Sequence, residues 1–258
     1  MKKRAQVSVF IIVGIIIVAA ISLFFLLDGT LTPSTGGSSE ISPNSYMESC
    51  LEDKIMEATE LISAQGGYVE NPLNFTFKFE DEEDYKGISY LCYNQNYYNP
   101  CIVQEPMLIQ HLKDEVYNYI QEDVRNCFDD LTSSLESKGF TIDARYRDFE
   151  VELISKKVVL NIDAEITATK TDEIKEINDL KTFTSTEFYD LALVVQEIVS
   201  QEAEYCNFNH LGYMLLYPEF KIDKFETGDT ETIYTVKYKK TEERFRFAIR
   251  SCVIPPGI

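Results

Sequence analysis

Apolar side chains recur at helical spacing in three stretches of the chain, which predicts three helices. The first helix is expected to begin at Ser45, because Glu48 stands at the position that completes a capping box. It would end before the glycine pair at 66–67, the second would run from about 106 to 138, and the third from about 187 to 205. The apolar positions of the three are Met47, Leu51, Ile55, Ala58 and Ile62; Ile109, Leu112, Val116, Ile120, Val124, Cys127, Leu131 and Leu135; and Phe188, Leu191, Ala192, Val195, Ile198 and Val199.

Other stretches alternate between apolar and polar residues, which predicts strands. The alternation is clearest at Phe75, Phe77 and Phe79, and residues 149–169 have the pattern of a hairpin that turns at 155–157. Three further strands are expected toward the C-terminus. Their ranges are about 213–225, 232–240 and 244–253.

A long apolar run precedes all of these elements. Residues 7–27 carry no charge, and their 21 residues match the length of about 20 that a helix needs to span a membrane. A cleaved secretory signal has a shorter apolar region of about 7–15 residues, followed by a small-x-small cleavage site that is lacking here. The sequence therefore predicts a transmembrane or stalk helix over residues 6–28, after a basic leader over residues 1–5.

The distribution of charge around this run predicts the orientation of the chain. Lys2, Lys3 and Arg4 precede it, and positive residues stay on the cytoplasmic side. We therefore expect a cytoplasmic N-terminus, with residues 28–258 extracellular. The protein would be located at the cell membrane or cell surface.

A linker rich in serine, glycine and proline follows the apolar run. It spans residues 29–45, and its composition is typical of a flexible tether. The fold class expected for the whole chain is α+β: one N-terminal transmembrane helix, this linker, and a disulfide-bonded extracellular α+β domain over residues 46–258 with about three helices and antiparallel strands. Two lobes, 46–139 and 140–258, are an alternative to a single domain.

The expected extracellular part is strongly acidic. The chain has a formal net charge of −19, and without the three basic residues of the leader the remainder has −22. This charge disfavours nucleic acid as a partner, because both molecules would be negative, and we expect no nucleic acid to bind.

Six cysteines all fall in the expected extracellular part, and an even number in an exported region is typical of disulfides. The spacing of zinc ligands is missing, so we expect no metal and no cofactor. Six cysteines allow 15 pairings. The pairs chosen here are Cys50–Cys127 between two helices, Cys92–Cys101 around a loop, and Cys206–Cys252 at the last strand.

The first residues resemble a known type of leader. A basic cluster, Ala5 and then Gln6-Val7-Ser8 at the head of the apolar run are similar to the archaeal class III signal peptide, the N-terminus of type IV pilin-like proteins. The resemblance implies that a prepilin peptidase cuts between Ala5 and Gln6. It also implies contact of residues 7–27 with membrane lipid, and with identical or related pilin-like subunits.

Residues that carry chemistry are few. His111 and His210 are the only histidines, and the motifs of nucleophilic, zinc or phosphate-binding enzymes are missing, so we predict that the protein is not an enzyme. Five consecutive acids at 80–84 lack the spacing of a calcium loop and are expected to be solvated.

A loop rich in tyrosine and asparagine is the best candidate for recognition. Tyr93, Tyr97 and Tyr98 lie in or beside the Cys92–Cys101 step, and such side chains make adaptable contacts in antibody loops. We expect them to contact an unknown extracellular partner; the alternative is that several of these tyrosines simply cover the sheet. Asn74 heads a three-residue glycosylation sequon.

Two functional hypotheses follow. The first is a pilin-like structural or adhesion subunit displayed outside an archaeal cell. The alternative is a single-pass membrane-anchored ectodomain for envelope organisation or partner binding, not assembled into a filament. The leader favours the first hypothesis. Phe10, where many pilin-like proteins carry Glu, and the interrupting linker favour the second.

Overall fold

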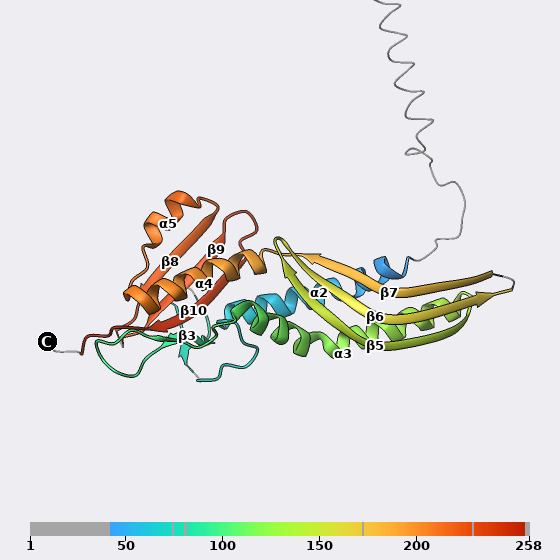
Figure 1. Cartoon of the computed structure of the whole chain (residues 1–258), viewed down its shortest axis with the longest axis horizontal. Coiled ribbons are helices and arrows are strands. Elements are labelled where there is room, and N and C mark those ends of the chain that lie inside the picture. Colours follow the sequence, from blue (N-terminus) through green and yellow to red (C-terminus); the bar gives the residue numbers. More distant parts are fainter. Residues whose placement is uncertain (1–41, 74, 80–81, 172, 229, 256–258) are drawn as a thin grey trace, which may run out of the picture. The chain divides into compact units, whose positions relative to one another are not determined.

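The computed structural model describes residues 42–255, except for 74, 80–81, 172 and 229 (Figure 1). These residues form helices α2–α5 and strands β1–β10. The bounds are α2 Pro43–Ala64, β1 Thr76–Phe77, β2 Lys86–Gly87, β3 Tyr90–Tyr93, β4 Ile102–Val103, α3 Leu108–Ser137, β5 Thr141–Ile154, β6 Lys157–Lys170, β7 Glu173–Ser185, α4 Phe188–Tyr205, α5 His210–Leu216, β8 Phe220–Glu226, β9 Thr232–Tyr238 and β10 Arg244–Arg250.

The three predicted helices are confirmed as α2, α3 and α4, but α2 begins earlier than expected. Its N-cap is Ser42, and Pro43 occupies the first turn, where proline's missing N–H leaves no helical hydrogen bond unmade. The predicted capping box of Ser45 and Glu48 therefore falls inside the helix. The predicted linker over 29–45 is shorter at its C-terminal end, and its residues 29–41 lie outside the described part of the chain.

A three-stranded antiparallel sheet, in the order β5-β6-β7, packs against α2 and α3. The predicted hairpin is confirmed as β5 and β6, which turn at Ser155 and Lys156 and are longer than expected. Strand β7 was not predicted. We call α2, α3 and β5–β7 the three-stranded region.

A second sheet has five strands in the order β4-β3-β10-β9-β8. Helix α4 packs on it, and α5 lies beside its edge strand β8 (Figure 1). We call β3, β4, β8–β10, α4 and α5 the five-stranded region. The prediction of a strand from Tyr213 is wrong, because residues 210–216 form α5 and the strand begins only at Phe220.

One large hydrophobic cluster joins the two regions. It contains Leu131 of α3 and Ile162 of β6 together with Val195 of α4 and Phe247 of β10, all buried. Strand β3 also pairs with β10, far along the chain. Elements from both sides of Gly139 therefore share one sheet and one core.

The fold class expected from the sequence needs correction. The described part is α+β with disulfides and mainly antiparallel strands, but it has four helices rather than three, and β3 and β10 are parallel. None of the helices within residues 42–255 combines the length and the apolar composition needed to span a membrane. The expected transmembrane helix over residues 6–28 lies outside the described residues.

Candidate functional site

Three disulfides join Cys50 to Cys127, Cys92 to Cys101, and Cys206 to Cys252, which are the pairs selected from the sequence. The first connects α2 with α3, and the other two lie in the five-stranded region. The Cα atoms of the pairs are 6.0, 5.3 and 5.7 Å apart, within the usual range for a disulfide. Three disulfides are compatible with an extracellular or secreted protein.

The second disulfide closes the loop between β3 and β4, and we call residues 92–101 the Tyr loop. Its backbone is held by the last residue of β10 and by the residues that follow this strand. The amide of Asn94 donates to the carbonyl of Arg250 over 3.0 Å, and the amide of Tyr98 donates to Val253 over 2.9 Å. In return, the amide of Cys252 donates to the carbonyl of Asn99 over 2.8 Å. The loop is thus fixed along its length rather than only at its two cysteines.

Side chains add further support inside the Tyr loop. The side-chain nitrogen of Asn94 donates to the carbonyl of Pro100 over 2.7 Å. The side-chain oxygen of Asn94 accepts from the backbone amide of Asn96 over 2.8 Å. The Arg250 guanidinium donates to the carbonyl of Asn94 and lies 5.6 Å from the ring centroid of Tyr97. One cation therefore contacts both the backbone and an aromatic ring of the loop.

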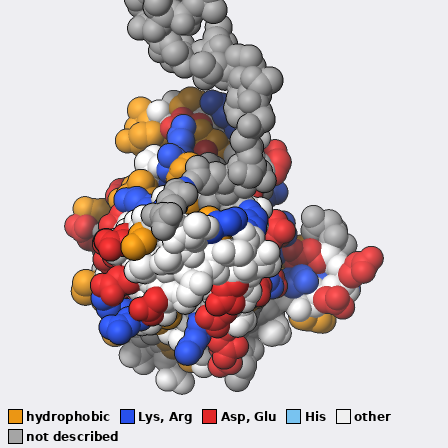
Figure 2. Space-filling view, turned by 90° about the vertical axis from the view of Figure 1, so that its right-hand side faces the viewer, with side chains coloured by type: hydrophobic (Ala, Val, Ile, Leu, Met, Phe, Trp, Pro, Cys, Tyr) orange, Lys and Arg blue, Asp and Glu red, His pale blue; other side chains and the backbone are white. Residues whose placement is uncertain are grey.

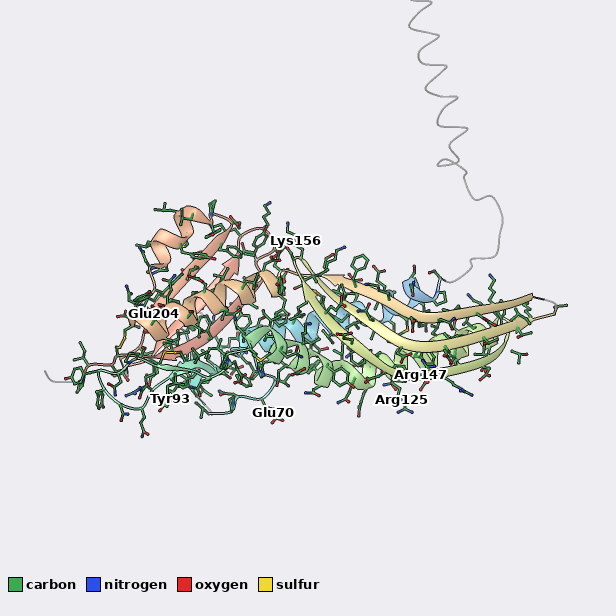
Figure 3. The ribbon with its side chains drawn as sticks, viewed as in Figure 1. Glu70, Tyr93, Arg125, Arg147, Lys156 and Glu204 are labelled. Carbon is green, nitrogen blue, oxygen red and sulfur yellow. A yellow bond between two sulfur atoms is a disulfide. The ribbon has the colours of Figure 1, made fainter. Side chains whose placement is uncertain are left out.

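The three tyrosines predicted to make contacts do not all point outward. Tyr97 is 45% exposed and Tyr98 is 58% exposed. Tyr93, which Figure 3 labels beside β3, is half-buried, and its ring packs on that of Tyr90 at 5.0 Å between centroids. Burial, and then the nearby Glu231, raises the pKa of Tyr90. Tyr93 thus covers the sheet, and Tyr97 and Tyr98 form the exposed part of the loop.

The Tyr loop lies in the longest stretch of the described chain that has no charged residue. Residues 87–104 contain no Asp, Glu, Lys or Arg, although such residues make up 26% of the chain. The next longest stretch is 205–218, and the third disulfide links it through Cys252 to the segment that holds the loop. Charge-free runs in an acidic chain are a sequence pattern that could have identified both stretches.

A groove of about 410 Å³ lies next to the Tyr loop, between α4 and β4. The lining residues include the apolar Leu91, Val103 and Val199, and Glu105 and Glu204 also line it. Figure 3 labels Glu204 near the end of α4. The groove therefore offers apolar contact beside two carboxylates.

His111, one of the two histidines, has a structural role beside this groove. Its Nε2 donates to the carbonyl of Gly67 over 2.8 Å, and its Nδ1 lies 3.9 Å from the carboxylate of Glu105. The hydroxyl of Tyr68 donates to Glu105 over 2.5 Å, and burial together with this hydrogen bond raises the pKa of Tyr68. His111 and Tyr68 thus hold Glu105 in place. His210, the other histidine, is the first residue of α5.

The acidic run at 80–84 is not wholly solvated, contrary to the prediction. Glu82 accepts a 2.7 Å hydrogen bond from the guanidinium of Arg246, and the two side chains are only 13% and 9% exposed. Arg246 also lies 4.5 Å from the ring centroid of Phe79. The ion pair attaches the segment before β2 to β10, so this acid stabilises the fold. Residues 80 and 81 lie outside the described residues.

The remaining predicted site residues fall where nothing is described. Ala5 and Gln6 of the processing site, the apolar run 7–27 and the sequon residue Asn74 all belong to the undescribed positions. Among the described residues, His, Cys, Asp and Glu do not gather in any group of three or more that could hold a metal ion.

Comparison with known proteins adds no family to these observations. The sequence matches no family model, and neither a curated protein nor a solved structure shows significant similarity to it.

Proposed function

We propose that this chain is a pilin-like structural or adhesion subunit of an archaeal cell surface, and that Tyr97 and Tyr98 contact an extracellular partner. The observation that carries the contact is the rigid Tyr loop, whose two exposed aromatic side chains stand on a backbone fixed at both ends and in the middle. A loop already held in one conformation loses little entropy when it binds.

The position of the Tyr loop supports binding of a partner at a distance from Ser42, where the N-terminal segment joins the described part of the chain. The N-terminal segment joins the described part at Ser42, directly before α2, whose 22 residues span about 33 Å. At the other end of α2, the carbonyl of Gln65 accepts from the amide of Ser89, just before β3 leads into the loop. The Tyr loop is therefore separated from the attachment point by the length of α2.

Attachment to the surface rests on the N-terminal sequence. Residues 7–27 would contact membrane lipid or related subunits, and cleavage between Ala5 and Gln6 would leave this apolar segment on the mature chain. The residues after it would face the exterior, in agreement with the three disulfides.

Two measurements test the proposal. Mass spectrometry of the protein from native membranes should find a mature N-terminus at Gln6; a chain that keeps Lys2, Lys3 and Arg4 would contradict processing as a pilin-like subunit. Replacement of Tyr97 and Tyr98 by Ser should reduce attachment of cells to a surface or to each other about tenfold or more, because two aromatic contacts are lost. The matched control is Tyr85→Ser, which removes a tyrosine that is 71% exposed but lies outside the loop.

The alternative function is a membrane-anchored ectodomain that organises the envelope or binds a partner without forming filaments. Phe10 favours it, because the acid that many pilin-like proteins carry at this position is missing. An uncleaved N-terminus together with reduced attachment of the tyrosine variant would support this alternative.

A further inference from the structure

Helix α5 exposes three large apolar side chains on one short element. Leu211 is 63% exposed, Leu215 is 84% exposed and Leu216 is 77% exposed, and we call these three residues the leucine face. A lone exposed leucine is ordinary, but a cluster on one helix marks a surface that contacts something else.

The helix that carries the leucine face is firmly held on its other side. The Asn209 side chain accepts from the amide of Gly212 over 2.9 Å and so caps the helix. The ring of Tyr213 packs on Phe208 at 5.5 Å between centroids, and the sulfur of Met214 accepts from the amide of Ile222 over 3.1 Å. The leucines are exposed because the opposite side of α5, with Tyr213 and Met214, is the side that packs against the rest of the domain.

A lipid surface does not suit the leucine face. Helices that lie on a membrane carry lysine or arginine on the polar side, whereas residues 205–218 contain neither. Helix α5 has only 7 residues, and the chain has a net charge of −19, so anionic headgroups would repel it.

A second copy of the chain suits the leucine face better than a lipid surface does, because of the charge and the area of the face. Two copies of an acidic protein repel each other, and residues 205–218 are a stretch where they can approach without opposing carboxylates. On the neighbouring β8, Lys221 pairs with Asp223 over 3.0 Å, so this acid is already compensated. The exposed leucine surface amounts to about 400 Å², half of the roughly 800 Å² that each partner buries in a standard interface.

We propose that the leucine face is a self-association surface, in which α5 of one copy packs against α5 of another about a two-fold axis. Leu211 and Leu215 are one helical turn apart and present the same stripe from both copies, which is the self-complementary geometry that a two-fold contact requires. The remainder of the interface would be a polar rim. This contact uses another surface than the Tyr loop and does not depend on its function.

The test is sedimentation velocity on the full chain, purified in a mild detergent over a range of concentrations. We expect the wild type to form dimers as concentration rises, and Leu215→Glu and Leu215→Lys both to weaken association at least tenfold. Two variants of opposite charge separate loss of the leucine contact from a change of net charge. Because residues 1–41 are common to all samples, a difference in association between the wild type and a variant reports on the leucine face.

The matched control is Ile174→Glu on β7, since Ile174 is 65% exposed and lies in the three-stranded region. It should associate as the wild type does. A monomeric wild type, or Leu215 variants that associate as strongly as the wild type, would overturn the proposal. A photo-reactive residue at position 216 should cross-link to residues 205–218 of the second copy. A cross-link to any other segment would exclude the two-fold contact.

Loss of self-association can be distinguished from failure of the proposed function. The Tyr97/Tyr98 double variant should dimerise normally, and Leu215→Glu should keep the Tyr loop intact. A Tyr loop variant that reduces attachment while association stays unchanged would confirm that the two surfaces act separately.

Discussion

The two regions of the domain differ at the surface much more than inside. In the three-stranded region, Arg147 makes ion pairs with Asp163 and Glu165 on the exposed face of the sheet. Seen from the β6–β7 end, acidic and basic side chains are interspersed (Figure 2). The five-stranded region instead carries the uncharged Tyr loop and leucine face. Figure 3 shows Arg125 and Arg147 in the first region, and Tyr93 and Glu204 in the second.

The difference between the two surfaces is not needed for folding, so we relate it to contact with a partner. Both regions contribute to one hydrophobic core, so folding does not require one surface to be charged and the other not. Interspersed charges keep a protein soluble and cost little, whereas a cluster of exposed apolar or aromatic side chains is typical of a contact surface. On the proposed function, the three-stranded region would be the scaffold and the five-stranded region the binding part.

The largest predicted effect concerns the disulfides, one in the scaffold and one in the binding part. Cys50–Cys127 closes a separation of 77 residues and Cys92–Cys101 one of 9. The loop-entropy relation gives losses of about 4.5 and about 2.6 kcal/mol when the pairs are changed to alanine. Denaturant unfolding of the two double variants should show this order. Equal losses would mean that loop closure does not govern their contributions.

The two double variants should rank in the opposite order in their effect on cell attachment. Changing Cys92 and Cys101 to alanine frees the two ends of the Tyr loop and should reduce attachment, although it lowers stability less. Changing Cys50 and Cys127 should leave attachment unaltered at temperatures where the variant is folded, because the Tyr loop keeps its hydrogen bonds.

A smaller effect is expected from two arginines, one in each region. Arg250→Met removes a charged hydrogen bond to the Asn94 carbonyl and should cost about 1.5 kcal/mol. Arg147→Met removes exposed ion pairs and should cost less than Arg250→Met, because its side chain is 49% exposed and the pairs are screened by solvent.

Hydrogen exchange distinguishes the two arginine variants more sharply than stability does. The amide hydrogens of Asn96 and Tyr98 should exchange faster in Arg250→Met than in the wild type. Their exchange rates should not change in Arg147→Met, since of these two arginines only Arg250 contacts the Tyr loop. Unchanged exchange in Arg250→Met would show that the backbone hydrogen bonds alone hold the loop.

The elements that the sequence predicts well are those with a strong apolar period. The inward positions of α2 and α3 are buried almost without exception, so their spacing matched the core they face. Strand β7 was missed because part of its buried side consists of Thr182 and Thr184, which look polar in the sequence. Helix α5 was missed because its leucines face outward and disguise its period.

The candidate site was predictable where it depends on neighbours in sequence. The Cys92–Cys101 spacing and the exposed pair Tyr97 and Tyr98 could be identified from local composition. The role of Arg250 could not, because it comes from a strand more than 150 residues away that pairs in parallel with β3. Contacts made by such pairing are set by the fold as a whole and leave no local pattern.

The smallest predicted effect lies at the junction of the two regions, at Glu187 directly before α4. Burial, and then the nearby Asp190, raises the pKa of the Glu187 carboxyl above its ordinary value of 4.5. The folded protein therefore holds this proton more tightly than the unfolded chain does. The penalty for the charged form is absent below about pH 4.5 and grows as pH rises through the raised pKa.

Glu187→Gln removes this penalty and keeps the size of the side chain, so it should stabilise the protein at pH 7 by under about 1 kcal/mol. The gain should shrink toward zero as pH falls to about 4, which thermal unfolding at both values would measure. Glu136→Gln, an exposed glutamate of α3, controls for the loss of one negative charge. A gain that persists at pH 4 would assign the effect to packing rather than to ionisation. A gain that disappears would mean that the scaffold and the binding part meet at a carboxyl whose charge opposes their contact.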